Sequence, residues 1–144
     1  MDDLSRRSGG RKAKSVVFTA EQIATRVASL GREITAAYPG GDLLLLGLLK
    51  GSFIFLADLV RAVERPLQVD FLVASSYGSG TVSSGNVRLL YDPATDLAGK
   101  HIVVVEDIID SGRTLTRLME LLRARRPASL SICTLLDKQI APKP

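Results

Sequence analysis

The fold of this 144-residue chain is decided by residues 102–115, which read Ile-Val-Val-Val-Glu-Asp-Ile-Ile-Asp-Ser-Gly-Arg-Thr-Leu. The β-branched run 102–105 is typical of a central strand that is covered on both faces. We expect this strand to end at the carboxylates of Glu106 and Asp107. The small and polar residues that follow predict a turn, which opens a helix over residues 114–125. A buried strand that leads through a polar turn into a helix is the basic unit of an α/β fold.

The preceding residues show the same alternation of helix and strand. A first helix is expected to begin after Thr19, because Thr19 and Gln22 have the spacing of a capping box, and to stop at residues 38–41. The apolar run 43–49 predicts a second buried strand. A second helix follows, with Ser52 as its N-cap and its end near Arg65. Further strands are expected at 67–74, 87–91 and 130–136. The sequence therefore predicts an α/β fold with a mostly parallel sheet flanked by helices.

The composition excludes a collagen-like, low-complexity or wholly disordered chain. Hydrophobic residues make up 46% of the chain and charged residues 24%, which are values typical of a globular domain. The single cysteine, Cys133, cannot form an internal disulfide and favours a reducing compartment, so we expect a cytoplasmic protein. No apolar run reaches the ~18 residues of a membrane span, so no membrane partner is expected.

The charge is concentrated near the amino terminus. The net charge is +4, and the first 15 residues contain five basic and two acidic side chains. We expect residues 1–15 to form a disordered basic arm, residues 16–140 to form the domain, and residues 141–144 to form a proline-rich tail. Such an arm is more often a solvated terminus than a nucleic-acid site, and no nucleic acid is expected as a partner.

The residues around the predicted turn point to a sugar phosphate as ligand. A turn before a helix N-terminus exposes backbone N–H groups, and Ser111 and Thr114 add hydroxyls, which together suit a phosphate. Gly112 allows the backbone to approach the ligand closely. Glu106 and Asp107 would repel a phosphate, but they can accept hydrogen bonds from vicinal hydroxyls such as those of a ribose.

Two further segments are expected to reach the same pocket. The carboxyl ends of parallel strands meet at one edge of a sheet. Lys50–Gly51 and Asp137–Lys138 each follow a predicted strand, so they can converge with residues 106–114. Lys50 could then meet the charge of a polyphosphate, and Lys138 the oxygen of an uncharged ring.

Residues 103–115 resemble the phosphoribosyl-pyrophosphate-binding signature of type I phosphoribosyltransferases, and within them the branch that acts on hypoxanthine and guanine. The resemblance extends from about Phe18 to Lys138. Four other segments fall in that family's order and approximate spacing: Gly47–Gly51, Val69–Phe71, Ser76–Tyr77 and Leu135–Lys138. The type I phosphoribosyltransferase fold is therefore expected.

The resemblance implies a role for each matching residue. Residues 110–114 (Asp110, Ser111, Gly112, Arg113, Thr114) would bind the 5′-phosphate, Glu106 and Asp107 the ribose hydroxyls, and Asp110 would be the catalytic acid and base at purine N7. Lys50 and Gly51 would bind pyrophosphate, with Leu49–Lys50 as a cis peptide. Ser76 and Tyr77 would lie on a mobile loop that closes over the donor. Lys138 would donate to the oxygen of a 6-oxopurine.

The resemblance also implies the reaction and its components. The chain would be an enzyme of purine salvage that joins hypoxanthine or guanine to the ribosyl group of phosphoribosyl pyrophosphate. Mg²⁺ would arrive on the donor, and Glu106 and Asp107 would meet it only through the ribose hydroxyls. A homodimer or homotetramer is expected. Relatives continue into a C-terminal hood, and the sequence stops before it, at Pro144.

Two alternatives to this enzyme remain open at the level of sequence. The first is a weakly active or inactive module that binds nucleotide or phosphoribosyl pyrophosphate. The second is an RNA-binding regulator built on the same fold, for which the basic arm is the only indication.

Overall fold

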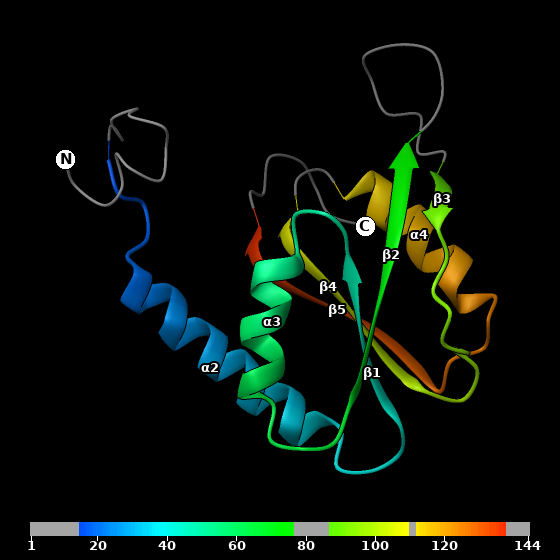
Figure 1. The fold of residues 1–144 in the computed structure, drawn as a ribbon, viewed down its shortest axis with the longest axis horizontal. Helices are drawn as coiled ribbons and strands as arrows, with labels where there is room; N and C mark the ends of the chain where they lie inside the picture. Colours follow the sequence, from blue (N-terminus) through cyan, green and yellow to red (C-terminus); the bar gives the residue numbers. More distant parts are fainter. Residues whose placement is uncertain (1–14, 77–86, 110–111, 138–144) are drawn as a thin grey trace.

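One five-stranded sheet, in the order β3–β2–β1–β4–β5, organises the chain (Figure 1). The structure is a computed structural model that describes residues 15–76, 87–109 and 112–137, so most of the expected arm, the loop 77–86 and the expected tail lie outside the described residues. The elements are α2 (Ala20–Ala37), β1 (Leu43–Leu48), α3 (Phe53–Ala62), β2 (Gln68–Ser76), β3 (Val87–Tyr91), β4 (His101–Ile109), α4 (Arg113–Arg123) and β5 (Ser129–Asp137). Only β3 is antiparallel to its neighbour, so the predicted α/β class with a mostly parallel sheet is confirmed.

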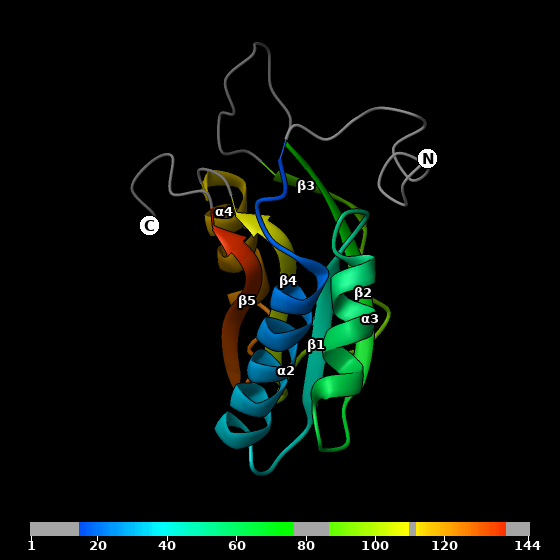
Figure 2. The same ribbon diagram turned by 90° about the vertical axis from the view of Figure 1, so that its left-hand side faces the viewer.

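Strand β1 lies at the centre of the sheet and determines where the strand ends meet. Leu45 lies opposite Val69 of β2 on one side and Val103 of β4 on the other, and both pairings are parallel. The chain leaves β1 through α3 toward β2, and it leaves β4 through α4 toward β5. These two crossovers run in opposite directions along the sheet, on its two opposite faces (Figure 2). Such a switch point leaves a crevice at the carboxyl ends of β1 and β4.

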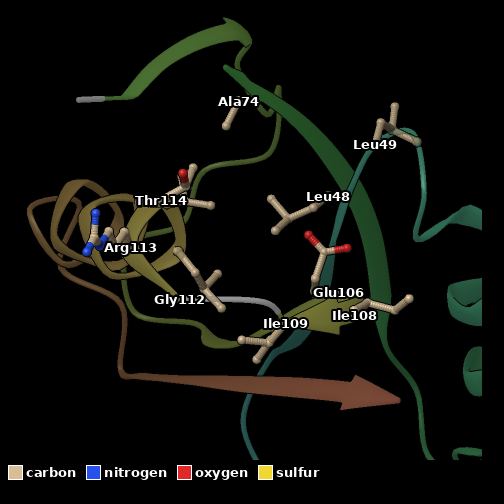
Figure 3. A pocket seen from close by; sticks show the side chains of 11 residues that line it. Leu48, Leu49, Ala74, Glu106, Ile108, Ile109, Gly112, Arg113 and Thr114 are labelled. Carbon is tan, nitrogen blue, oxygen red and sulfur yellow. The ribbon is translucent and has the colours of Figure 1, made fainter. Parts of the chain in front are cut away.

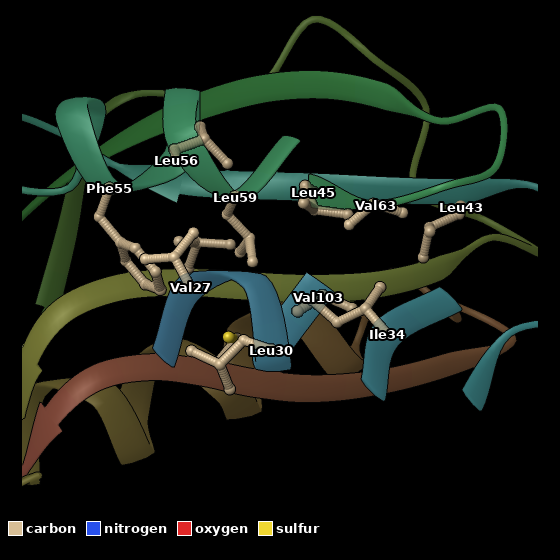
Figure 4. Close-up of a cluster of buried hydrophobic side chains, with 12 residues drawn as sticks. Val27, Leu30, Ile34, Leu43, Leu45, Phe55, Leu56, Leu59, Val63 and Val103 are labelled. Atoms are coloured by element: carbon tan, nitrogen blue, oxygen red, sulfur yellow. The ribbon is translucent and has the colours of Figure 1, made fainter. Parts of the chain in front are cut away.

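Each face of the sheet buries its own apolar cluster. Alternate residues of β1 and β4 point to opposite faces, as in any strand. Leu43, Leu45 and Val103 pack against α2 and α3 (Figure 4). On the other face, a second cluster packs against α4; its members from β1, β4 and α4 are Leu44, Leu46, Ile102, Val104, Leu118, Met119 and Leu122. The sheet is therefore covered on both faces, as the apolar runs of β1 and β4 predict.

The two predicted helix caps have different outcomes. Thr19 forms the predicted capping box, because its hydroxyl accepts from the Gln22 N–H at 3.1 Å and its own N–H donates to Gln22 Oε1 at 2.8 Å. Ser52 occupies the predicted N-cap position of α3, but it forms no side-chain cap bond. Its buried hydroxyl donates to the Leu48 carbonyl at 2.6 Å. Its side chain therefore stabilises the turn between β1 and α3, while its carbonyl accepts from the Leu56 N–H at 2.8 Å.

Helix α3 is shorter than predicted and ends at Ala62 instead of near Arg65. Arg65 has another role, because its guanidinium donates to the carbonyls of Tyr38 at 2.5 Å and Gly41 at 2.6 Å. Arg65 thus donates hydrogen bonds to carbonyl groups at and just after the end of α2. This contact joins residues that are distant in the sequence, so the residues around Arg65 do not predict it.

Strand β4 is longer than predicted. The expected end at Glu106 and Asp107 is wrong, because β4 continues to Ile109. Strand β5 pairs with the extension, with Ile108 opposite Leu136 and Ile109 opposite Asp137. Glu106 and Asp107 are therefore residues within a strand, and their side chains leave opposite faces of it.

A buried carboxylate connects β2 to the segment before β4. Asp70 is 9% exposed, and its two oxygens accept from the N–H groups of Phe71 at 2.7 Å and Thr95 at 2.9 Å. Burial alone raises the pKa of Asp70, but the hydrogen bonds donated by Thr95, Phe71 and Ala94 outweigh it, so the net pKa is lowered. Asp70 therefore holds the 94–95 segment as an ionised group.

No helix within residues 15–76, 87–109 and 112–137 is long and apolar enough to cross a bilayer.

Candidate active site

A cavity of about 210 Å³ lies at the carboxyl edge of the sheet, between β1, β4 and the start of α4 (Figure 3). Strand β1 contributes Leu48, and Leu49 follows from the turn after it. Strand β2 contributes Ala74. The remaining lining residues come from the predicted signature and from α4: Glu106, Ile108, Ile109, Gly112, Arg113, Thr114, Leu115 and Leu118. The sheet thus brings together residues that are far apart in the sequence, as the predicted topology requires.

Gly112 and the first residues of α4 are the described part of the predicted phosphate-binding turn. Gly112 is the N-cap of α4 and has φ 83°, a left-handed conformation that glycine adopts without a steric penalty. Its carbonyl accepts from both the N–H and the hydroxyl of Thr116, at 2.9 and 2.8 Å. Arg113 and Thr114 line the cavity at the positive end of the helix dipole. Asp110 and Ser111 lie outside the described residues.

Glu106 provides the carboxylate of this cavity. Figure 3 shows it leaving β4 on the face that carries α4, with its oxygens near Leu48. One of these oxygens, Oε1, accepts from the Asp107 N–H at 3.0 Å. Burial, with a contribution from the neighbouring Asp107 carboxylate, raises the pKa of Glu106 to about 7. At neutral pH, Glu106 therefore exchanges between a form that only accepts hydrogen bonds and a form that also donates one.

Asp107 lies on the other face of the sheet, on the side of α3. A Cβ atom at Gly51 would be 3.3 Å from both carboxylate oxygens of Asp107, so the carboxylate rests against the Gly51 backbone. The Ile108 N–H donates to Asp107 Oδ1 at 2.9 Å. The Asp107 carboxylate thus lies near the turn after β1, and it also interacts with the neighbouring Glu106 carboxylate.

The turn after β1 has the predicted cis peptide between Leu49 and Lys50. Two backbone bonds hold its ends, from the Leu49 N–H to the Leu72 carbonyl at 3.0 Å and from the Phe53 N–H to the Lys50 carbonyl at 3.4 Å. The N–H groups of Lys50 and Gly51 donate to no acceptor among the described residues. This turn therefore presents two backbone donors at the carboxyl edge of the sheet.

The third predicted segment, at the end of β5, reaches the same edge but lines a different cavity. Asp137 is opposite Ile109 in the β4–β5 register. It borders a cavity of about 310 Å³ between α4 and β5, together with Ile109, Gly112, Leu115, Thr116, Met119, Arg123 and Ile132. Lys138 and Tyr77 lie outside the described residues. Ser76 is the last residue of β2, opposite Val87.

The sequence did not predict the apolar part of the first cavity. Leu48, Ala74 and Ile108 line it, and Ile108 is 40% exposed. Apolar residues at strand ends carry no local signal that distinguishes a ligand surface from a core. The alternation of side chains along an extended β4 could have separated Glu106 from Asp107, had the strand been predicted to continue.

Among the described residues, no three histidine, cysteine, aspartate or glutamate side chains converge on a possible metal site. Glu106 is the only acidic side chain among the described residues that line the first cavity, which suits a metal ion whose other ligands are oxygens of a bound phosphate or water.

The chain belongs to the phosphoribosyl transferase domain family, whose model matches residues 15–144. The site geometry agrees with that class, since the signature turn, Glu106 and the cis peptide all lie at the switch point of the sheet. The family and the fold that the sequence predicts are therefore confirmed.

Similar proteins are named as hypoxanthine phosphoribosyltransferases. The hypoxanthine phosphoribosyltransferase of Escherichia coli (strain K12) is 51% identical over 125 residues, which are 85% of this chain and 70% of that protein. The hypoxanthine-guanine phosphoribosyltransferase of Mycobacterium avium is 52% identical over 131 residues, 87% of this chain and 64% of that protein. A crystal structure of the hypoxanthine phosphoribosyltransferase from Staphylococcus aureus superposes with a TM-score of 0.88 at 37% identity, covering 96% of this chain and 73% of the other.

Proposed function

We propose that this chain catalyses the transfer of the 5-phosphoribosyl group from phosphoribosyl pyrophosphate to hypoxanthine or guanine in purine salvage. The observation that carries the proposal is the cavity at the carboxyl edge, where the signature turn at Gly112–Thr114 faces the Glu106 carboxylate. An anion cradle and a hydroxyl acceptor in one cavity suit a ribose phosphate. The identity of about half with named hypoxanthine phosphoribosyltransferases supports the choice of acceptor.

Each part of the donor is assigned to one part of the site. The N-terminal turn of α4, with Ser111, Gly112, Arg113 and Thr114, would bind the 5′-phosphate. Glu106 and Asp107 would accept hydrogen bonds from the ribose hydroxyls. The N–H groups of Lys50 and Gly51, which have no acceptor in the described part of the chain, would bind the pyrophosphate together with the Lys50 ammonium. Ser76 and Tyr77 would close over it, and Lys138 would donate to the 6-oxo group of the purine; these three roles rest on the family resemblance.

The reaction is a substitution at C1 of the ribose. The bond from C1 to the pyrophosphate oxygen breaks, and pyrophosphate leaves with the electron pair. A purine nitrogen forms the new bond to C1, and the proton of the purine is handled by Asp110 at N7, a role that also rests on the resemblance. Positive charge develops at C1 in the transition state, and the ionised Glu106 carboxylate would stabilise that charge.

The proposed reaction also has consequences for the metal ion, the oligomeric state and the compartment of the protein. Magnesium would enter with the donor, held by pyrophosphate and ribose oxygens, since it keeps water and phosphate ligands in preference to a protein cage. Glu106 would meet the metal only through the hydroxyls that the metal binds. We also propose a homodimer or homotetramer in the cytoplasm, where the single cysteine would stay reduced.

Turnover tests the proposal directly. The full chain is incubated with hypoxanthine, phosphoribosyl pyrophosphate and magnesium, and inosine monophosphate and pyrophosphate are quantified by chromatography. We expect equal amounts of both products, a lower rate for Thr114→Ala, and an unchanged rate for Arg117→Ala. Arg117 is a matched control because it is exposed on the same helix and forms an ion pair with Glu120. Donor binding without product would instead identify a binding module, and retention of RNA that is lost on removing residues 1–15 would favour a regulator.

A further inference from the structure

Two hydroxyl groups form the same kind of hydrogen bond on two sides of the first cavity. Ser52 Oγ donates to the Leu48 carbonyl at 2.6 Å, and the Ser52 N–H donates to the same carbonyl at 3.3 Å. Thr116 Oγ1 and the Thr116 N–H donate to the Gly112 carbonyl at 2.8 and 2.9 Å. Each carbonyl therefore accepts twice from the residue four positions later. Leu48 and Gly112 both border the cavity (Figure 3).

The bond from Ser52 closes the turn that contains Lys50 and Gly51. Ser52 is 0% exposed, so bulk water does not compete for its hydroxyl. A Cβ atom at Gly47 would be 3.3 Å from Ser52 Oγ and 2.7 Å from Leu56 Cδ2, so the glycine leaves room for the hydroxyl beside β1. The Ser52 carbonyl accepts from the Leu56 N–H at 2.8 Å. Ser52 thus connects the end of β1 to the first turn of α3.

A carbonyl that is held in one direction also fixes the N–H group of its own peptide unit, because that unit is planar. The Leu48 carbonyl shares a peptide unit with the Leu49 N–H, which donates to the Leu72 carbonyl at 3.0 Å. The Ser52 hydroxyl strengthens the hold on the carbonyl end of this unit. The chain therefore enters the Lys50–Gly51 turn from a peptide unit that is fixed at both ends.

The bond from Thr116 has the matching effect at the start of α4. The Gly112 carbonyl shares a peptide unit with the Arg113 N–H, which lies at the positive end of the helix dipole. The Thr116 hydroxyl adds a second donor to that carbonyl and so limits rotation of the unit. The direction of the Arg113 N–H thus depends on a side chain outside the predicted signature turn 110–114.

We propose that Ser52 and Thr116 are positioning residues whose hydroxyls set the affinities for the two ends of the donor separately. Ser52 acts on the pyrophosphate through the Lys50–Gly51 turn, and Thr116 acts on the 5′-phosphate through the start of α4. The inference rests on the proposed function only for the identity of the two ligands. A peptide donor that is already held in one orientation loses less entropy when it binds an anion, so loosening the donor weakens binding.

The test uses one probe for each end of the donor and a further threonine as a control. Magnesium pyrophosphate reports on the turn after β1, and ribose 5-phosphate reports on the start of α4. Thr35 Oγ1 forms the same kind of bond, to the Gly31 carbonyl at 2.7 Å, but Thr35 lines neither of the two cavities at the carboxyl edge. Binding is measured by calorimetry for the full chain and for Ser52→Ala, Thr116→Val and Thr35→Val, after thermal unfolding has shown that each variant is folded.

Each variant should lose affinity for one probe at most. Ser52→Ala should weaken magnesium pyrophosphate by about fivefold, the effect of one hydrogen bond, and leave ribose 5-phosphate unchanged. Thr116→Val should weaken ribose 5-phosphate by a similar factor and leave pyrophosphate unchanged. Thr116→Ser keeps the hydroxyl and should bind both probes as the wild type does, and Thr35→Val should change neither affinity.

Three outcomes would contradict these expectations. If Ser52→Ala or Thr116→Val weakens both probes or neither, the positioning role of that residue is overturned. If Thr116→Ser binds as weakly as Thr116→Val, the hydroxyl is not the group that acts. A loss of affinity in Thr35→Val would show that such bonds affect binding only through general stability, which would overturn the proposal for both residues.

A measurement without ligand keeps the inference independent of the proposed function. The N–H groups of Leu49 and Phe53 each donate to a backbone carbonyl, at 3.0 and 3.4 Å. Hydrogen exchange at these two amides should be faster in Ser52→Ala than in the wild type, and unchanged in Thr116→Val. Equal exchange in Ser52→Ala and the wild type would overturn the role of Ser52, whether or not the chain turns over hypoxanthine. Absent turnover in the wild type with the expected exchange pattern would count against the proposed function alone.

Discussion

The Thr95 N–H donates to Asp70 Oδ2 at 2.9 Å and thereby ties the segment before β4 to a buried carboxylate of β2. The other oxygen accepts from the Phe71 N–H at 2.7 Å. Both carboxylate oxygens of Asp70 therefore accept hydrogen bonds from backbone N–H groups. Asp70 acts as a structural anion that stabilises the connection between the antiparallel edge and the centre of the sheet.

Replacing this anion should destabilise the fold. In Asp70→Asn the amide nitrogen meets one of the two N–H donors, which leaves a buried donor unsatisfied and costs about 1–3 kcal/mol. Urea unfolding followed by circular dichroism measures the change. The exposed Asp58, paired with Arg61 on α3, is the control, and Asp58→Asn should change stability by about 0–1 kcal/mol.

The pH dependence provides a second check on Asp70. Its folded pKa is lowered from the ordinary value of 3.8, so the stabilisation is present above that value and is lost as the pH falls through the folded pKa. The free energies of unfolding of wild type and Asp70→Asn should therefore converge in acid. A difference that stays constant down to the acid transition would show that the charge of Asp70 contributes nothing.

Glu106 should make binding of the ribose depend on pH near neutrality. Its pKa of about 7 means that the ionised form grows as the pH rises from 6 to 8, and ribose hydroxyls donate to that form. Affinity for ribose 5-phosphate should rise by up to about tenfold over this range. Glu106→Gln should retain only the dependence that comes from the ligand's own phosphate, and calorimetry of both proteins isolates the difference.

Without ligand, the raised pKa of Glu106 should make the stability of the folded protein fall as the pH rises, whereas affinity for the ribose should rise. The folded pKa of Glu106 is raised above its ordinary value of 4.5, so its contribution to stability is complete below 4.5 and is lost as the pH rises to about 7. The wild type should lose stability relative to Glu106→Gln across this window. Parallel stability curves would contradict the raised pKa.

Gly31 marks the closest approach of α2 and α3. A Cβ atom there would be 2.4 Å from the Ala62 carbonyl oxygen and 2.5 Å from Ala62 Cβ. Gly31→Ala should therefore lower stability, because overpacking costs about 1–3 kcal/mol and exceeds the gain of about 1 kcal/mol in helix propensity. Gly40→Ala is the control, since a Cβ atom at Gly40 meets nothing within 4 Å. A stabilised Gly31→Ala would show that the helices separate easily.

Cys133 should react slowly with thiol reagents in the native protein. It is 8% exposed, and burial raises the pKa of its thiol to about 11, so the reactive thiolate is scarce at neutral pH. Alkylation by iodoacetamide at pH 8, followed by mass spectrometry, should be much slower for the folded chain than for the chain in urea. Equal rates would indicate that β5 opens readily.

The sequence predicts local features of this fold better than those that depend on distant contacts. The capping box at Thr19 and Gln22 is contained within four residues and forms as predicted. Ser52 is the N-cap of α3 as predicted, but its hydroxyl donates to the Leu48 carbonyl of β1. The predicted helix end near Arg65 is wrong, because the Arg65 guanidinium donates to carbonyl groups that lie near the end of α2. Likewise, β4 extends past Glu106 because β5 pairs with Ile108 and Ile109, and that pairing is absent from the local sequence.

In the candidate site, too, the features set by local sequence could be predicted, and those set by distant contacts could not. The segment from Gly112 to Thr114 could be assigned from its sequence because turn chemistry is local, and its cavity forms at the predicted edge. The separation of Glu106 from Asp107 could not be assigned, because it depends on whether the strand continues. The contact between Asp107 and Gly51 is also tertiary, and no spacing in the sequence encodes it.

The parallel pairing of β1 with β4 has a consequence for how the protein matures. Leu48 and Glu106 border one cavity although the whole α3–β2–β3 region separates them in the chain, so no partly folded intermediate that lacks the β1–β4 ladder can hold the ligand. Parallel pairing between distant strands forms late in folding, because the entropy of closing the long loop is lost before the contacts between the strands form. A bound substrate would therefore stabilise the folded protein and not its partly folded intermediates. The cellular abundance of the protein would then rise with the supply of the donor.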